Sequence, residues 1–322
     1  MRQFAKPTIV VSKCLEFDAC RYNGEMIPDV TIRNLQPFVT FIPVCPEVEI
    51  GLGTPRETIR IVEENGENRL VQPSTREDVT EKMEQFSNDF LQTISDVDGF
   101  ILKNRSPSCG TRDVKIYSGF EKAPAKGKGS GLFGGAVVKK FSHLPIEEEG
   151  RLSNFIIREH FFTRLFTIAY YKMIKHNKNM KDLVSFQSDN KYLFMAYNQV
   201  KQKELGRIIA NHKNEKIEVV FENYEKTLYE LFMRTPRYTS NVNVCEHIFG
   251  YFKTKLKKQE KDHFIELLQK YAEKKIPLSS LLTILKSWAI RFDEKYLLRQ
   301  TYFEPYPEAL VEISDSRKGR DY

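Results

Sequence analysis

Three short apolar runs, each leading to a cysteine, constrain the fold of this chain most strongly. The runs are TIVVS (8–12), FVTFIPV (38–44) and GFILK (99–103), and all are rich in β-branched and aromatic residues. Runs of this length and composition are typical of buried parallel strands. Between the last two runs a helix is predicted, because Ser74 and Glu77 have capping-box spacing and apolar residues then recur every three or four positions. The order strand, helix, strand predicts a Rossmann-like α/β domain with a mainly parallel sheet.

A change of pattern after residue 150 predicts a second domain. From NFIIREHFFTRLF onward, apolar residues such as Phe155, Phe162 and Phe166 lie at helical spacings. We therefore expect an α/β domain over residues 1–150 and an all-α domain over residues 151–322.

Charge divides the chain at the same place. Residues 1–150 hold 19 Lys and Arg against 22 Asp and Glu, a net charge of −3, and the remaining residues hold 31 against 21, a net charge of +10. A concentrated positive excess favours a polyanionic partner, because Lys and Arg release counterions when they bind phosphates. A solvated basic helical surface is the alternative, and charge alone does not separate the two.

Composition and motifs disfavour several classes of protein. No apolar stretch approaches the length of a membrane span, and the N-terminus lacks the apolar core of a secretory signal, so we expect a cytoplasmic protein with no membrane partner. Five cysteines are too few and too unevenly placed for a disulfide framework. The segment GSGLFG (129–134) follows no apolar strand, which argues against a dinucleotide-binding loop. We expect residues 119–135, rich in Gly and Lys, to form a mobile basic loop.

Three of the five cysteines occupy equivalent positions. Cys14, Cys45 and Cys109 each follow one of the predicted strands. Because the carboxyl ends of parallel strands face one crevice, the three thiols are expected there either as metal ligands or as small core residues. The chain lacks the paired Cys-x-x-Cys spacings of zinc sites, which favours an iron–sulfur cluster with one open, Lewis-acidic iron. Cys20 is either a fourth ligand or a structural thiol.

Segments around these cysteines carry a family resemblance. VSKCLEFDACRYNGE (11–25), VCPEVEIGLGTPRE (44–57) and ILKNRSPSCGT (101–111) resemble, in this order, the signature blocks of the thiouracil desulfurase (TudS-like) family. The second half resembles the YbgA-like helical domain in stretches such as NVNVCEHIFGYFK (241–253) and LLRQTYFEPYPEAL (297–310). Together the two resemblances cover nearly the whole chain, as in fused desulfurases that look to act on 4-thiouridine in tRNA.

The resemblance implies an enzyme that exchanges the sulfur of a thiolated pyrimidine for oxygen from water at a [4Fe-4S] cluster. It makes Cys14, Cys45 and Cys109 the cluster ligands, with one iron left open to the substrate's sulfur. It also makes Glu47 and Ser106 catalytic, with Glu47 as general acid and base. The residues alone leave Glu47 open as an ordinary ion-pair partner and Ser106 as a turn residue. Exchange of sulfur for oxygen needs no external electron donor, so no nicotinamide or flavin cofactor is expected.

Further residues are candidates for binding the substrate. Lys103 lies at a strand end beside the expected crevice, Ser108 shares a turn with Ser106, and Arg21 lies within a matching block. An ordinary structural role is the alternative for each. Basic and aromatic residues interleave in the second half, a pattern typical of RNA binding. With the family resemblance, which implies tRNA as the partner, these stretches are candidates for tRNA contact. The expected RNA-contacting residues are Lys126, Lys128, Lys253, Lys255, Lys257 and Lys258.

The sequence thus favours desulfuration of 4-thiouridine in tRNA to uridine, with release of sulfide. One alternative is desulfuration of free thiouracil or another small thiolated compound. The charge of +10 on the second half argues against it, because a small neutral base needs no basic platform. A second alternative is a non-catalytic RNA-binding protein with a structural metal. The sequence carries no signal for an oligomeric state or for a role of Cys245.

Overall fold

The computed structural model describes residues 2–94, 96–120 and 124–312. It divides into two compact units, one formed by residues up to Ala169 together with those from Pro307 onward, and one formed by Tyr170–Tyr306. The division lies within a single long helix, α5 (Phe155–Asn177), and not at residue 150, where the sequence changes pattern.

The first unit contains a four-stranded sheet in which all pairings are parallel. Its strands, in spatial order, are β2 (Thr40–Val44), β1 (Thr8–Ser12), β6 (Gly99–Leu102) and β9 (Ile146–Glu148). Every residue of β6 is buried, as are the last four residues of β1, which explains why these strands are continuous apolar runs. The three predicted strands and the α/β fold are confirmed.

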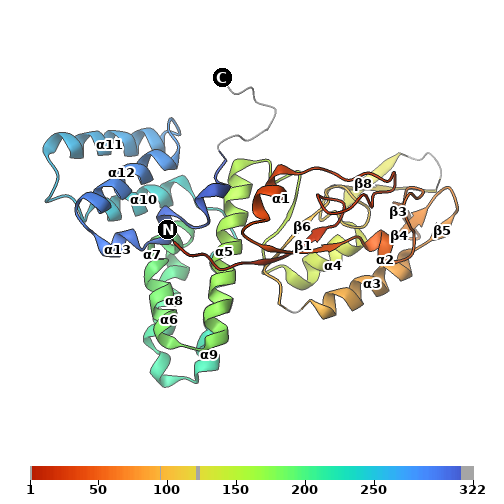
Figure 1. Ribbon diagram of the computed structural model, residues 1–322, viewed down its shortest axis with the longest axis horizontal. Helices are drawn as coiled ribbons and strands as arrows, with labels where there is room; N and C mark the ends of the chain where they lie inside the picture. The colour runs from red at the N-terminus through yellow and green to blue at the C-terminus, as the bar shows by residue number, and fades with distance from the viewer. Residues whose placement is uncertain (1, 95, 121–123, 313–322) are drawn as a thin grey trace. The chain divides into compact units, whose positions relative to one another are not determined.

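Helices cover both faces of this sheet. They are α1 (Val30–Leu35), α2 (Pro46–Glu49), α3 (Thr80–Thr93) and α4 (Leu132–Phe141). Phe133 of α4 packs 5.9 Å from Phe90 of α3, and Phe141 of α4 packs 5.1 Å from Phe100 of β6. Figure 1 shows α1 on the opposite face from α3 and α4. After β1 the chain therefore passes to one face of the sheet, and after the adjacent β6 it passes to the other face. Open α/β sheets bind ligands at such a point, where neighbouring strands connect to opposite faces.

A second, five-stranded sheet was not predicted from the sequence. Its strands, in spatial order, are β5 (Glu77–Asp78), β4 (Glu67–Gln72), β3 (Arg60–Glu64), β7 (Val114–Tyr117) and β8 (Ala125–Gly129). β3 and β7 are parallel and the other pairs are antiparallel.

Two predictions for this part of the chain are wrong. The helix expected from Ser74 begins at Thr80, because Glu77 and Asp78 pair with β4 and no capping box forms. The loop expected over residues 119–135 is wrong for residues 125–129, which form β8, and for residues 132–135, which begin α4. β8 is an edge strand held by backbone hydrogen bonds, and its mostly exposed side chains carry no apolar alternation. Residues 121–123 of the expected loop lie outside the described residues.

The second unit is helical throughout its described residues, as predicted for this part of the chain. Its core is rich in aromatic side chains; for example, Tyr171 stacks on Tyr224 at 5.4 Å and Trp288 packs 5.3 Å from Phe264. No described helix combines the length and the apolar character needed to cross a bilayer. After α5 the elements are α6 (Met180–Asp189), α7 (Lys191–Tyr197), α8 (Gln199–Ala210), η1 (His212–Asn214), α9 (Ile217–Leu231), α10 (Tyr238–Phe249), α11 (Lys258–Ala272), α12 (Leu278–Arg291), α13 (Lys295–Leu298) and η2 (Thr301–Phe303).

Candidate active site

The candidate site is formed by the loops at the carboxyl ends of β1, β2 and β6. Cys14 lies two residues beyond β1, Cys45 directly follows β2 and precedes α2, and Cys109 lies in the loop after β6. The backbone N–H of Lys13 donates to the carbonyl of Val44 at 2.8 Å, so the first two loops leave the sheet side by side. Cys14 is half-buried, and Cys45 and Cys109 are buried.

The thiols are close enough to affect one another's ionisation. Burial, followed by the negative charge of Cys45, raises the pKa of Cys14 to about 12. Burial also raises the pKa of Cys109, with smaller contributions from Cys14 and Cys45. Burial and then Cys45 raise the pKa of Cys20 to about 12. Without a bound metal these three thiols are neutral at pH 7, whereas a metal would favour the thiolates.

The thiols do not form a site for a single ion. Within the part of the chain that the structure describes, no group of three or more His, Cys, Asp or Glu side chains is arranged to hold one metal ion. All five cysteines are free thiols.

Glu47 links the loops of Cys45 and Cys109. Its Oε1 accepts a hydrogen bond from the Ser108 hydroxyl at 2.6 Å, and its Oε2 accepts two from the Arg56 guanidinium, the Nε bond being 2.8 Å long. The Arg56 side chain is 4% exposed and that of Glu47 is 13% exposed. Arg56 Nη1 also donates to the carbonyls of Cys20 and Gly53, at 2.9 and 2.8 Å. One buried arginine therefore fixes the carboxylate and ties the first cysteine loop to the second.

Ser106 and Ser108 form a chain of hydroxyls that leads to this carboxylate. The Ser106 oxygen lies 2.9 Å from that of Ser108 and accepts the backbone N–H of Cys109 at 3.1 Å. Because the Ser108 hydroxyl donates to Glu47, the hydrogen between the two serines comes from Ser106. Ser106 therefore holds the turn at Cys109 and also begins a hydrogen-bonded path to Glu47.

Two glutamates at the end of β9 clamp the loop of Cys109 at both ends. Glu149 accepts the backbone N–H of Asn104 at 2.7 Å and forms an ion pair with Lys103. Glu148, 2% exposed, accepts the backbone N–H and the hydroxyl of Thr111 at 2.7 and 2.9 Å. Burial raises the pKa of Cys14, and the positive charge of Lys103 offsets a small part of this rise, so Lys103 lies near that thiol while it is paired with Glu149.

The glycine-rich start of α4 and the residue before it pack against the same loop. The backbone N–H groups of Gly131 and Gly134 donate to the carbonyls of Gly110 and Ser108, at 2.7 and 2.9 Å. A Cβ atom at Gly134 would lie 2.4 Å from the carbonyl oxygen of Cys109, so only glycine allows this approach. These glycines support the backbone of a cysteine loop, a role that differs from phosphate binding.

The other predicted residues lie outside this hydrogen-bonded network. Arg21 forms an exposed ion pair with Glu25 and lies over the ring of Tyr22. Its role in substrate binding stays a prediction. The six lysines predicted to contact RNA are all exposed. Three of them are ion-paired, Lys126 with Glu63, Lys128 with Asp113 and Lys255 with Glu294.

Comparison with known proteins identifies the first unit. The family model for 2-thiouracil desulfurase matches residues 9–149, which include all three cysteine loops. The uncharacterized protein YbbK of Bacillus subtilis (strain 168) is 36% identical over 118 residues, 34% of this chain and 77% of YbbK. The chain belongs to the 2-thiouracil desulfurase family. The resemblance seen in the cysteine blocks is confirmed.

The second part of this desulfurase matches a different family. Residues 191–307 match a family of proteins of unknown function, DUF1722. The uncharacterized protein YbgA of Escherichia coli (strain K12) is 23% identical over 149 residues, 46% of this chain and 88% of YbgA, which confirms the YbgA-like resemblance. Among solved structures, the [4Fe-4S]-dependent thiouracil desulfidase TudS is 25% identical, over 46% of this chain and 93% of that chain, with a TM-score of 0.36.

Sequence reasoning missed part of the desulfurase site. Arg56, Glu148 and Glu149 are not among the site residues predicted from the sequence. The one signal for Arg56 was its place nine residues after Glu47 in the same block. The two glutamates lie far from Cys109 in sequence, so only the β6–β9 pairing reveals their contact with its loop.

Loss of the Arg56 guanidinium is expected to destabilise the desulfurase strongly. Arg56→Met leaves the carboxylate of Glu47 in a largely buried site with no ion-pair partner, which costs about 3 kcal/mol. Urea unfolding of variant and wild type in the same metal state measures this loss. In a Glu47→Gln background the cost of Arg56→Met is expected to be smaller, because no charge is left unpaired.

Arg69→Met is the matched control for this prediction. Arg69 pairs with Asp78, but their side chains are 28% and 34% exposed, so the loss is expected to be much smaller than that for Arg56→Met. Equal losses for Arg56→Met and Arg69→Met would contradict a special role of the buried pair.

Proposed function

We propose that this desulfurase replaces the sulfur of 4-thiouridine in tRNA with oxygen from water, giving uridine and sulfide. One observation carries the proposal. Glu47, a largely buried carboxylate fixed by Ser108 and Arg56, lies between the loops of two of the family's cysteines. A carboxylate in this position suits a reaction in which protons must move from water to the leaving sulfide and the ring.

We further propose that Cys14, Cys45 and Cys109 hold a [4Fe-4S] cluster. The donors are three free thiols from three adjacent strand ends, and their charges affect one another. In a cluster each thiolate binds a different iron, so the sulfurs need not converge on one point as they would around a single ion. When bound, such a cluster supplies a Lewis-acidic iron that polarises the carbon–sulfur bond of the substrate.

The chain's own residues supply the proton transfers in this proposal. Glu47 takes a proton from the attacking water and later delivers it to the substrate or to the leaving sulfide. Arg56 holds one carboxylate oxygen, and Ser108 holds the other. The Ser106 hydroxyl, hydrogen-bonded to Ser108, extends the path of exchangeable protons away from Glu47. Water provides all the hydrogen and oxygen that the exchange requires, so no electron donor enters.

The test is an assay of the anaerobically purified full chain on tRNA that contains 4-thiouridine and on free 2-thiouracil. We expect 4-thiouridine to disappear with one equivalent of sulfide released, and the uridine formed in ¹⁸O-water to carry the label. Conversion of 2-thiouracil without conversion of tRNA would limit the proposal to free bases. No conversion of either substrate by cluster-containing protein would remove it.

Charge reversal at the start of α11 is expected to weaken tRNA binding. Lys257 and Lys258 are exposed, and positive charge at a helix N-terminus does not stabilise the helix. Lys257→Glu with Lys258→Glu should weaken tRNA binding about tenfold near 0.1 M salt. The negative slope of the logarithm of the binding constant against the logarithm of salt concentration should become shallower by about 1 to 2. Filter binding at several salt concentrations measures both effects.

Activity on free 4-thiouridine should stay unchanged in this double variant. Lys203→Glu with Lys213→Glu is the matched control, because these lysines are exposed on α8 and η1 of the same unit. Lys255 is left intact since its reversal would face Glu294. A similar loss of tRNA binding in both double variants would argue for a diffuse effect of charge and against a contact at α11.

A further inference from the structure

A buried serine ends the strand that leads to Cys14. Ser12 is the last residue of β1 and is 1% exposed. Residues 9–11 before it are apolar and buried, and a hydroxyl in such surroundings costs free energy unless it is hydrogen-bonded. In the parallel ladder Ser12 lies opposite Val44, the residue before Cys45. The sequence therefore places one buried hydroxyl where the first two cysteine loops leave the sheet.

The hydroxyl of Ser12 also contacts the strand that leads to Cys109. Its oxygen accepts the backbone N–H of Lys103, the residue directly after β6, at 2.9 Å. A hydroxyl that accepts one hydrogen bond keeps its own hydrogen for another. Because Ser12 is buried, that hydrogen needs an acceptor within the protein.

The sulfur of Cys109 lies within hydrogen-bond reach of Ser12. Burial raises the pKa of Cys109, and a hydrogen bond with the Ser12 side chain offsets part of this rise. A hydrogen bond that lowers the pKa of a thiol favours the thiolate. A thiolate has no hydrogen to donate, so Ser12 is the donor whenever Cys109 is ionised. Such a bond to a charged acceptor is stronger than one between neutral groups.

The two serines of the Cys109 loop give their hydrogens to oxygen atoms. The Ser108 hydroxyl lies 3.8 Å from the sulfur of Cys109 but donates to Glu47 at 2.6 Å. Ser106 donates in turn to Ser108, at 2.9 Å. A bond from a hydroxyl to a carboxylate is charge-assisted, so the hydrogen of Ser108 stays with Glu47. Of the three serines, Ser12 is therefore the one whose hydrogen is left for the sulfur.

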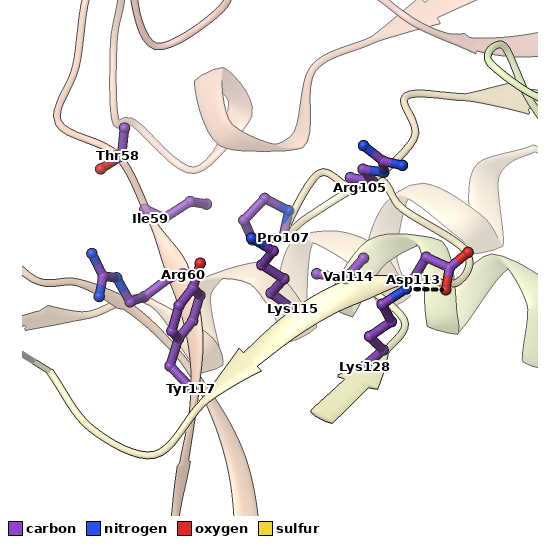
Figure 2. A pocket seen from close by; sticks show the side chains of 10 residues that line it. All are labelled: Thr58, Ile59, Arg60, Arg105, Pro107, Asp113, Val114, Lys115, Tyr117 and Lys128. Carbon is purple, nitrogen blue, oxygen red and sulfur yellow. Dashed lines mark hydrogen bonds and ion pairs between the residues drawn. The ribbon is translucent and has the colours of Figure 1, made fainter. Parts of the chain in front are cut away.

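The cation of the same loop serves a different surface. Arg105 lines a pocket of about 450 Å³ together with Pro107 and Lys115, as Figure 2 shows. None of the described residues that line this pocket is a cysteine. The burial that disfavours a thiolate at Cys109 is therefore opposed by a neutral hydroxyl, Ser12, and this makes the single hydrogen bond important.

We infer that Ser12 is a positioning residue for the proposed cluster and acts by donating a hydrogen bond to the sulfur of Cys109. The inference rests on the cluster in the proposed function and is independent of the identity of the substrate. A hydrogen bond withdraws electron density from a thiolate, so Cys109 becomes a weaker electron donor and a weaker base. Weaker donation suits the Lewis acid that the desulfuration requires, and a weaker base resists the protonation that releases iron.

Ser12→Ala in the anaerobically purified full chain tests the inference. We expect the reduction potential of the bound cluster to become more negative, because the hydrogen bond stabilises the charge that reduction adds. Release of iron to a chelator at mildly acidic pH should become about tenfold faster, the scale of one charge-assisted hydrogen bond. A potentiometric titration followed by electron paramagnetic resonance measures the potential, and the absorbance of the chelate measures the release.

Resonance Raman spectra report the hydrogen bond itself. In wild type reconstituted in heavy water, a stretching vibration between iron and cysteine sulfur should shift relative to ordinary water. In Ser12→Ala this vibration should lie at higher frequency and the deuterium shift should be smaller. The wild-type comparison needs no variant, so it stays decisive if loss of the Lys103 contact makes Ser12→Ala unstable. Absence of a deuterium shift in wild type would overturn the inference.

Ser87→Ala is the matched control. Ser87 is 2% exposed and donates to the carbonyl of Met83 within α3 at 2.6 Å, so this variant loses a buried hydroxyl outside the cysteine loops. It should keep the wild-type potential and rate of iron release. Ser12→Thr retains a hydroxyl and should restore both. A wild-type potential in Ser12→Ala that keeps its iron would limit Ser12 to supporting the backbone of Lys103, and the inference would be wrong.

The outcomes separate this inference from the proposed function. Wild type that binds no cluster would overturn the inference together with the proposed cofactor. A cluster in wild type that responds to Ser12→Ala, in a chain that converts no thiolated substrate, would retain the inference and remove the proposed reaction. Equal changes in Ser12→Ala and Ser87→Ala would overturn the inference and leave the reaction intact.

Discussion

Replacement of Cys109 by alanine is expected to abolish binding of iron and acid-labile sulfide. Anaerobically purified wild type should contain about four irons and four sulfides per chain, and the variant almost none. The fold should persist, because the loop of Cys109 is held by backbone bonds to α4 and by the carboxylate of Glu148, neither of which needs the thiol. Metal and sulfide analysis, with circular dichroism as the check on folding, measures both results.

Two other cysteines supply the controls for this prediction. Cys245 is fully buried in the helical unit, so Cys245→Ala should keep the full iron and sulfide content. Cys20→Ala separates three-thiolate from four-thiolate ligation. Retention of the cluster in this variant leaves one iron open for substrate, whereas its loss would make Cys20 a ligand and close that position. Zinc in place of iron in the wild type would contradict the cluster altogether.

The strands and the positions of the cysteines were predictable from the sequence for a topological reason. A strand buried on both faces must be apolar throughout, as β6 is, and such a run stands out in the sequence. Parallel pairing then requires that whatever follows each strand lies at the same edge of the sheet. The cysteine loops therefore share an edge whatever their other contacts are.

The partners that fix these loops were not predictable in the same way. The contact of Arg56 with Glu47 depends on a turn whose path the apolar pattern does not encode. The bond from Glu148 to Thr111 requires β9 to pair with β6, and an acidic run looks the same whether it is solvated or buried. β8 was missed because an edge strand with exposed lysines and glycines is held by its backbone.

Substitution of Glu47 by glutamine is expected to reduce turnover about 10³-fold, the scale of a lost general acid and base. Glutamine has nearly the same shape, and its amide can still hydrogen-bond to Ser108 and Arg56, so the fold should be retained, although the unpaired charge of Arg56 lowers the free energy of unfolding. The iron and sulfide content should equal that of wild type, because the thiols are unchanged. Single-turnover assays of sulfide release, normalised to iron content, separate loss of chemistry from loss of the cluster.

Glu49→Gln is the matched control for this substitution. Glu49 lies on the same short helix, two residues from Glu47, but it is exposed. The same charge is therefore removed close to the site without a change in the network of Arg56 and Ser108. If both variants lose activity equally, the local negative charge matters and not the carboxylate that Ser108 contacts. If Glu47→Gln alone is inactive and retains its iron, proton transfer is assigned to the carboxylate between the cysteine loops, and a purely structural role for Glu47 is excluded.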